Sequence, residues 1–185
     1  MTTPSTKLRR DAAASVFAYA IAGIALLVHA GTTITNDWFS DDLVLAATDD
    51  AGQHNVAVPT AAVPDWAVTT LRVADVVEWL AAAAVLVTLA ACVMGMIRGE
   101  VFTRATARWA TWSSWAAVAL LVLPLIGRIP ATNMALQSTP QPDAWDARAI
   151  DDGWWYLYVG MMTLSFLALA LRRGTQLRED QDGLI

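Results

Sequence analysis

The chain has 185 residues, of which 56% are hydrophobic and 16% are charged, and its formal net charge is −5. This composition, with a mean hydropathy of +0.45, excludes an ordinary soluble domain. It predicts one membrane domain over residues 1–185, surrounded by a lipid bilayer and without a nucleic acid partner. The single cysteine, Cys92, excludes an intrachain disulfide and a cysteine-rich metal site.

The N-terminal part predicts a first membrane helix over residues 12–36. It follows a polar segment that carries Lys7, Arg9 and Arg10, and His29 is its notable titratable side chain. A secretory signal peptide starts in the same way, but its apolar region is usually only about 7–15 residues long. We therefore expect a retained helix. His29 would lie about two turns before its end, deep enough to need a hydrogen-bond partner on another helix.

Residues 37–67 predict an acidic outer loop that contains a small β-hairpin. The apolar runs 43–47 and 55–58 flank the polar stretch 48–53, which is typical of two strands joined by a turn. Two strands alone are marginally stable in water, so the hairpin needs support from the second outer loop or from another subunit. Asp49 and Asp50, near the turn, are candidates for contact with a basic patch on such a subunit.

The rest of the chain predicts three further helices, over 68–97, 104–128 and 153–171. The uncharged run 79–97 would reach roughly 28 Å as a helix, close to the ~30 Å hydrocarbon thickness of a bilayer. Residues 98–103 form an inner turn and residues 129–152 a second outer loop. Pro124 should bend the third helix rather than end it. The fourth helix opens with an aromatic belt of Trp154, Trp155, Tyr156 and Tyr158.

The basic residues orient these helices, because short basic loops stay on the cytoplasmic side. Arg72, Arg128 and Arg148 would lie outside, whereas nine basic residues would lie inside: Lys7, Arg9, Arg10, Arg98, Arg104, Arg108, Arg172, Arg173 and Arg178. Both termini are thus expected to be cytoplasmic in a bacterial plasma membrane. The expected fold class is an all-α integral membrane protein, a four-transmembrane-helix up-and-down bundle with a small extracytoplasmic β-hairpin.

Four charged residues form the main candidate site. Arg72, Asp75 and Glu78 recur at helical spacing near the outer end of the second helix, and Arg128 ends the third. Ionisable groups at membrane depth are often functional. At the boundary an ion pair between an arginine and the two acids satisfies them, which favours a structural pair over a proton or cation route. We expect no catalytic, cofactor or metal residues and no enzyme, because phosphate-loop, nucleophile-elbow and metalloprotease motifs are missing.

The inner turn carries one resemblance. Gly99-Glu100-Val101-Phe102-Thr103, with Ala107 shortly after, resembles the inner loop of an uncharacterised bacterial family of small four-span membrane proteins, in which Gly, any residue and Pro or Val precede Phe-Thr. The resemblance implies the four-span layout and no assigned reaction. Thr103 is placed to cap the third helix, Gly99 to allow the tight end of the second, and Phe102 to lie at the membrane interface.

The leading functional hypothesis is a non-catalytic accessory or scaffolding subunit of a larger membrane complex. By analogy with small actinobacterial membrane proteins, the first complex to consider is the respiratory cytochrome bc and cytochrome oxidase supercomplex. One alternative is a membrane sensor or regulator, although it would need a cytoplasmic reading domain beyond tails and one turn. The other is a small ion or solute transporter that uses Asp75 and Glu78, although only His29 and Pro124 interrupt the apolar helices.

Overall fold

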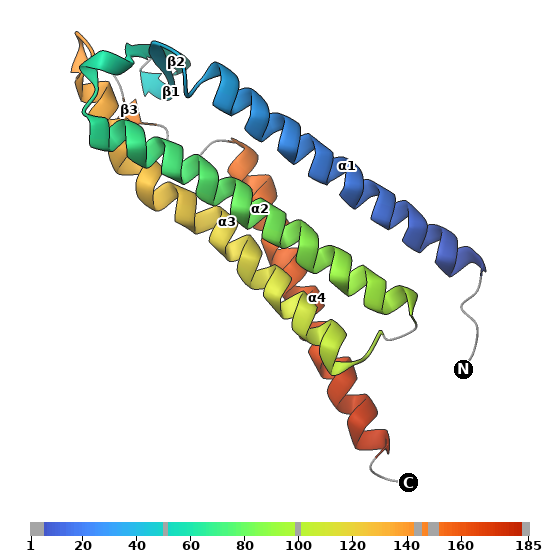
Figure 1. Cartoon of the computed structure of the whole chain (residues 1–185). Coiled ribbons are helices and arrows are strands. Elements are labelled where there is room, and N and C mark those ends of the chain that lie inside the picture. The colour runs from blue at the N-terminus through green and yellow to red at the C-terminus, as the bar shows by residue number, and fades with distance from the viewer. Residues whose placement is uncertain (1–5, 50–51, 99–100, 143–145, 148–151, 183–185) are drawn as a thin grey trace. The chain divides into compact units, whose positions relative to one another are not determined.

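A computed structural model describes the chain except for residues 1–5, 50–51, 99–100, 143–145, 148–151 and 183–185. Within the described residues there are four long helices, three strands and one short 3-10 helix (Figure 1). In chain order they are α1 (Thr6–Asn36), β1 (Asp42–Asp49), β2 (Gly52–Pro59), η1 (Thr60–Ala62), α2 (Asp65–Ile97), α3 (Arg104–Gln137), β3 (Asp146–Ala147) and α4 (Asp152–Asp182).

All four helices of the described chain are long and apolar enough to cross a membrane. Their apolar segments are Ala14–Asn36, Asp65–Ile97, Arg104–Gln137 and Gly153–Gln181. The 33 residues of α2 correspond to about 50 Å, so this helix exceeds the ~30 Å apolar thickness of a bilayer. The four predicted helices and the predicted hairpin are confirmed.

Two predicted C-terminal helix ends are wrong, and the first helix begins at Thr6 rather than at residue 12. The third helix does not end at residue 128 but continues to Gln137, with both Pro124 and Pro130 inside it. Pro130 removes one backbone hydrogen bond, but the turns that follow are anchored by Ala131, Ala135 and Leu136, which are almost completely buried. The fourth helix continues to Asp182 rather than ending at 171. The second predicted outer loop and the predicted C-terminal tail are correspondingly shorter.

The chain divides into two compact units. The hairpin unit consists of residues 27–80 and 120–155, and the arginine unit consists of residues 1–26, 81–119 and 156–185. Each of the four helices contributes residues to both units.

A three-stranded antiparallel sheet with the order β2-β1-β3 characterises the hairpin unit. β1 and β2 pair along their whole length, from Asp42 opposite Pro59 to Asp49 opposite Gly52. Gly52 has a φ of 131°, a conformation that other residues rarely adopt, so the hairpin requires glycine where β2 begins. β3, which lies in the second predicted outer loop, pairs with β1 at Ala47 and Thr48.

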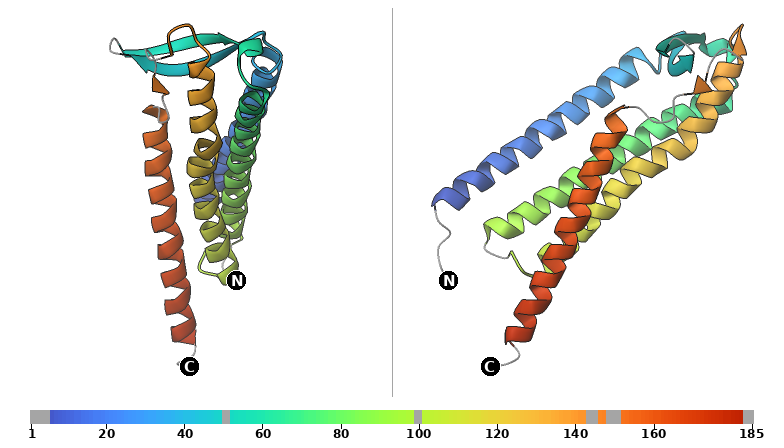
Figure 2. Two further views of the ribbon diagram at one scale, coloured as in Figure 1. Left: turned by 90° about the vertical axis from the view of Figure 1, so that its left-hand side faces the viewer. Right: turned by 180° about the vertical axis from the view of Figure 1, so that it is seen from behind.

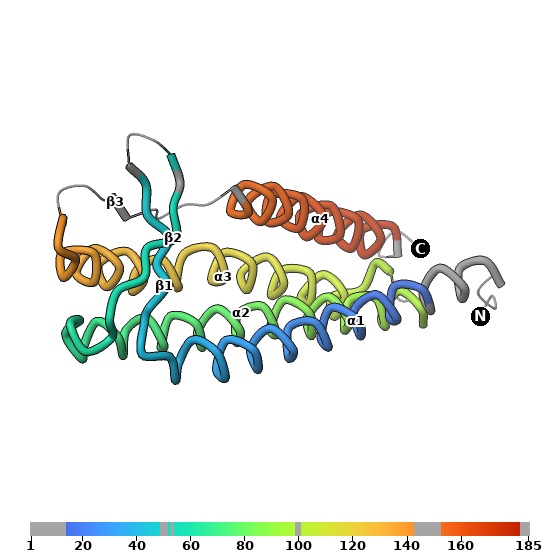
Figure 3. The backbone as a smooth tube through the Cα atoms, turned by 90° about the horizontal axis from the view of Figure 1, so that it is seen from above, coloured from blue at the N-terminus to red at the C-terminus, as the bar shows by residue number. Residues whose placement is uncertain are grey.

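The hairpin is supported by the ends of two helices of its own chain. Its buried face, which includes Leu45, Ala47 and Val58, joins one hydrophobic cluster with Val63, Ala67, Val68, Ala131, Ala135 and Leu136. Figures 2 and 3 show the hairpin running across the start of α2 and the end of α3. The second outer loop contributes β3, one of the two supports predicted, but the helix ends were not foreseen. The hairpin is therefore supported by its own chain and does not require another subunit for its support.

In the arginine unit, small residues let the helices approach closely. Its buried cluster consists of Cys92 on α2, Ala107 and Ala110 on α3, and Ala168 and Leu171 on α4. The Thr103 hydroxyl accepts a hydrogen bond from the Thr106 amide at 3.2 Å and so caps α3. The Thr106 side chain, only 1% exposed, also lies 3.1 Å from the Thr103 hydroxyl and faces Gly95 of α2.

This close approach generates a stability prediction. A Cβ at Gly95 would lie 2.8 Å from Thr106 Oγ1, which is too close for two nonbonded atoms. We expect Gly95→Ala to displace Thr106 from its place beside the cap and to lower the free energy of unfolding by about 1–3 kcal/mol. Thermal unfolding of the detergent-solubilised protein, followed by circular dichroism, measures the effect.

Gly160→Ala is the matched control. Gly160 lies inside α4, and nothing would come within 4 Å of an added Cβ. Alanine is preferred over glycine in a helix by about 0.5–1 kcal/mol, so this variant should be as stable as the wild type or more stable. Equal destabilisation by the two substitutions would contradict the assigned contact.

Candidate functional site

A cavity of about 540 Å³ lies in the hairpin unit and contains the predicted charge group. It is lined by the end of α1, strand β1, the first turns of α2 and the part of α3 around Arg128. Its ionisable and aromatic side chains are His29, Asp37, Trp38, Arg72, Asp75, Glu78, Trp79 and Arg128. His29 and Arg128, which are 99 positions apart in sequence, thus share one site.

Arg128 bridges the two acids of α2. Its Nη2 lies 2.6 Å from Asp75 Oδ1 and 2.9 Å from Glu78 Oε2. Asp75 and Glu78 are three residues apart on the same helix, so their carboxylates lie on one face and meet a single guanidinium. The three side chains are between 23% and 40% exposed, and the low-dielectric surroundings make their attraction stronger than that of a fully solvated pair. The predicted ion pair is present, and Arg128 is its arginine.

Trp38 is a further member of the site. Its indole Nε1 donates a hydrogen bond of 3.2 Å to Asp75 Oδ2, the carboxylate oxygen that Arg128 does not bind. Its ring stacks on Trp79 of α2, with a centroid distance of 5.7 Å and an interplanar angle of 22°. Trp38 lies two residues after the end of α1. These contacts therefore tie the connection between α1 and β1 to α2.

Arg72 has another role than pairing with an acid. Its Nη2 donates a hydrogen bond of 2.6 Å to the Trp38 backbone carbonyl, and it forms no ion pair with any described residue. Its Nε is buried without a hydrogen-bond partner among the described residues. Arg72, one of the two candidate partners for the acids, thus binds the backbone of Trp38. Arg128 binds Asp75, which accepts the hydrogen bond from the Trp38 indole.

His29 lies on α1 seven residues before the end of that helix, the predicted depth, and lines the cavity. Its backbone carbonyl accepts hydrogen bonds from the hydroxyls of Thr32 and Thr33, at 2.8 and 3.0 Å. Its imidazole makes no hydrogen bond to the described residues, so the interhelical partner expected from the sequence is not found there. The imidazole shares the cavity with Asp37, Asp75 and Glu78.

The other predicted candidates lie elsewhere. Asp49 ends β1, whereas Asp50 and Gly99 lie outside the described residues. Phe102, 46% exposed, and the capping Thr103 belong to the arginine unit. The Phe102 ring contacts α4 so closely at Gly174 that a Cβ there would be 2.5 Å from it.

Sequence reasoning missed Trp38 and Trp79. A signal existed, since Trp79 lies four residues after Asp75 on one face of α2, but Trp38 lies 37 residues before Asp75 across the entire hairpin. In chemical terms the site contains paired charges and aromatic rings. Among the described residues, no group of three or more His, Cys, Asp or Glu side chains is placed to hold a metal ion.

Comparison with known proteins adds no assignment: no family model, no curated protein and no solved structure matches the chain.

The ion pair leads to a second prediction. Arg128→Gln leaves the Asp75 and Glu78 carboxylates next to each other in a partly buried cavity without the guanidinium that contacts them both. We expect a loss of about 1–2 kcal/mol in unfolding free energy, between the values for exposed and fully buried pairs. Arg173→Gln, an exposed arginine without an ion pair to the described residues, is the control and should be neutral.

Combining Arg128→Gln with Glu78→Gln distinguishes the pair from a general charge effect. If the two side chains interact, the double variant loses less stability than the sum of the single variants. Thermal unfolding of all four proteins in the same detergent provides the comparison. Additive losses would show that Arg128 and Glu78 act independently.

Proposed function

We propose that the chain is a multi-pass membrane protein that acts as a non-catalytic accessory subunit of a larger membrane complex. The proposal rests on one observation: the charged residues of the hairpin unit bind one another and Trp38. Arg128 neutralises Asp75 and Glu78, and Asp75 and Arg72 both hold Trp38. These charges organise an ordered cap of strands and aromatic rings instead of forming a reactive centre.

The uncovered surface of α1 also supports an accessory role. None of its most apolar segment is buried within the chain, and Phe17, Ile24 and Leu27 are 69%, 62% and 74% exposed. In a membrane these side chains contact lipid or the helices of another protein, and van der Waals packing between helices is sufficient for such association. The respiratory cytochrome bc and cytochrome oxidase supercomplex is the complex to test first, by analogy.

A second candidate function, transport of a cation, is favoured by one observation. The cavity of about 540 Å³ brings His29 and Asp37 together with Asp75 and Glu78. Carboxylates and imidazoles that share a cavity near a membrane boundary can relay protons or bind cations. The ion pairs of Arg128 oppose this function, because a cation must compete with a guanidinium that is already in contact with both α2 carboxylates.

The orientation in the membrane is tested with single cysteines. In a Cys92→Ala background we introduce Asn55→Cys in β2, Gln141→Cys after α3 and Gln181→Cys near the end of α4. The basic residues predict that both termini are cytoplasmic, so an impermeant thiol reagent should label the first two cysteines in intact cells but not the third. In permeabilised cells the reagent should label all three cysteines. Labelling of Gln181→Cys alone would show that the protein has the opposite orientation in the membrane.

Association is tested by gentle solubilisation and affinity purification of the tagged full chain. We expect a large membrane complex to co-purify, and Asp49→Lys with Asp50→Lys to weaken this association more in low salt than in high salt. Asp41→Lys with Asp42→Lys, at the opposite end of the same hairpin, makes the same change in charge and should have a smaller effect.

Two outcomes would overturn the accessory role. The first is a protein that purifies alone under all gentle conditions. The second is uptake of protons or cations by vesicles that contain only this chain, with the uptake lost in Glu78→Gln although thermal stability is unchanged. That second result would establish transport in its place.

A further inference from the structure

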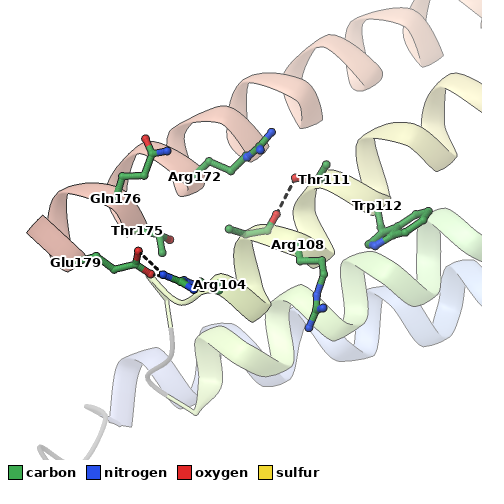
Figure 4. A pocket seen from close by; sticks show the side chains of 9 residues that line it. Arg104, Arg108, Thr111, Trp112, Arg172, Thr175, Gln176 and Glu179 are labelled. Carbon is green, nitrogen blue, oxygen red and sulfur yellow. Dashed lines mark hydrogen bonds and ion pairs between the residues drawn. The ribbon is translucent and has the colours of Figure 1, made fainter.

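A basic pocket lies in the arginine unit between α3 and α4 (Figure 4). Its volume is about 380 Å³, within the usual range of roughly 300–1,000 Å³ for small-ligand sites. Arg104, Arg108 and Trp112 line it from α3, and Arg172, Gln176 and Glu179 line it from α4. Three arginines and one glutamate give these side chains a net charge of +2.

One of the three arginines is occupied. Arg104 Nε and Nη2 lie 2.7 and 2.9 Å from the two oxygens of Glu179, in the two-pronged geometry of a strong arginine–carboxylate pair. Figure 4 shows this bridge joining α3 to α4. It also occupies both oxygens of the one carboxylate among the lining residues.

The other charged and polar groups offer donors without acceptors. The side chains of Arg108, Arg172, Gln176 and Trp112 make no hydrogen bond or ion pair with any described residue. In Figure 4 Arg172 and Gln176 extend from α4, whereas the Trp112 ring and the Arg108 guanidinium lie on the side of α3 away from α4. The flexible stem of Arg108 gives its guanidinium reach. Such a set of unpaired donors suits an anion with several oxygens.

The position of the pocket along the helices identifies the source of the anion. The uncharged run of α3 begins at Trp109, immediately after Arg108, and that of α4 ends at Leu171, immediately before Arg172. The pocket thus lies where charge gives way to apolar sequence on both helices. Trp112 and Trp115, 59% and 65% exposed, continue from it along α3. In a bilayer this boundary is the headgroup level, where tryptophan is favoured.

We infer that this pocket binds the phosphate group of an anionic phospholipid. Arg172 and Arg108 neutralise the phosphate, Gln176 donates a hydrogen bond to it, and the acyl chains run along the exposed tryptophans of α3. A soluble phosphate would use the arginines but not the apolar surface beside them. The site requires membrane insertion but is independent of the accessory role, so the two proposals can fail separately.

The test measures lipid binding to the full chain in detergent by native mass spectrometry. Phosphatidylglycerol and phosphatidylcholine with identical acyl chains are the two probes. We expect the wild type to prefer phosphatidylglycerol and the double variant Arg108→Gln/Arg172→Gln to lose at least about tenfold of that preference, since each arginine near a membrane surface contributes severalfold. The Arg104–Glu179 bridge remains in this variant, and its melting temperature should be unchanged.

Arg98→Gln/Arg173→Gln is the matched control. It removes two exposed arginines that do not line the pocket, and it changes the net charge equally. This control should keep the preference for phosphatidylglycerol. An equal loss in the two double variants would show diffuse attraction to a basic surface and overturn the site, as would an unchanged preference in the pocket variant.

A competition experiment separates lipid from soluble anion. We expect millimolar inorganic phosphate or glycerol phosphate to leave phosphatidylglycerol bound, because neither contacts the apolar surface. Displacement of the lipid by either compound at such concentrations would assign the pocket to a soluble phosphate and overturn the lipid assignment.

Discussion

A charged side chain at the end of an apolar helix must find an opposite charge or remain in water, and in the hairpin unit Arg128 meets this requirement for two acids at once. This constraint has consequences for three segments of the chain. It joins α3 to α2, and through the second oxygen of Asp75 it reaches Trp38 between α1 and β1. The stacking of Trp38 on Trp79 also ties this connection to α2. The hairpin therefore starts from a point whose position is set by electrostatics as well as by apolar packing.

The two units use charge differently. In the hairpin unit the guanidinium of Arg128 is in contact with both α2 carboxylates, and Arg72 holds a backbone carbonyl. In the arginine unit Glu179 pairs with Arg104, and Arg108 and Arg172 remain available. The first arrangement stabilises the fold, which is why a structural role is proposed for it. The second leaves positive charge unpaired, which is why a ligand is proposed there.

Small residues determine how closely the helices pack. Gly95 faces Thr106, Gly127 faces Thr70, and Gly174 faces the Phe102 ring, each with less room than a methyl group needs. In a membrane such approaches compensate for the missing hydrophobic drive between helices, because lipid is as apolar as the helices themselves. Glycines at 23, 31 and 160 have no such neighbour. A glycine in these helices thus marks a contact only where the other helix presents a side chain to it.

The sequence by itself determined the four helices and the hairpin. An uncharged run of about 20 residues is a local property, and the apolar runs 43–47 and 55–58 on either side of a polar stretch encode two strands without reference to the rest of the chain. It also predicted that an arginine would pair with Asp75 and Glu78, because unpaired charges are costly near a membrane. The sequence did not predict where α3 ends. Pro130 is a local stop signal, but the burial of Ala131, Ala135 and Leu136 under the hairpin overrides it. Tertiary structure alone decided between Arg72 and Arg128, brought Trp38 to Asp75 and formed the basic pocket between α3 and α4. These are pairings between segments distant in sequence, and they depend on how helices face one another, which no local pattern specifies.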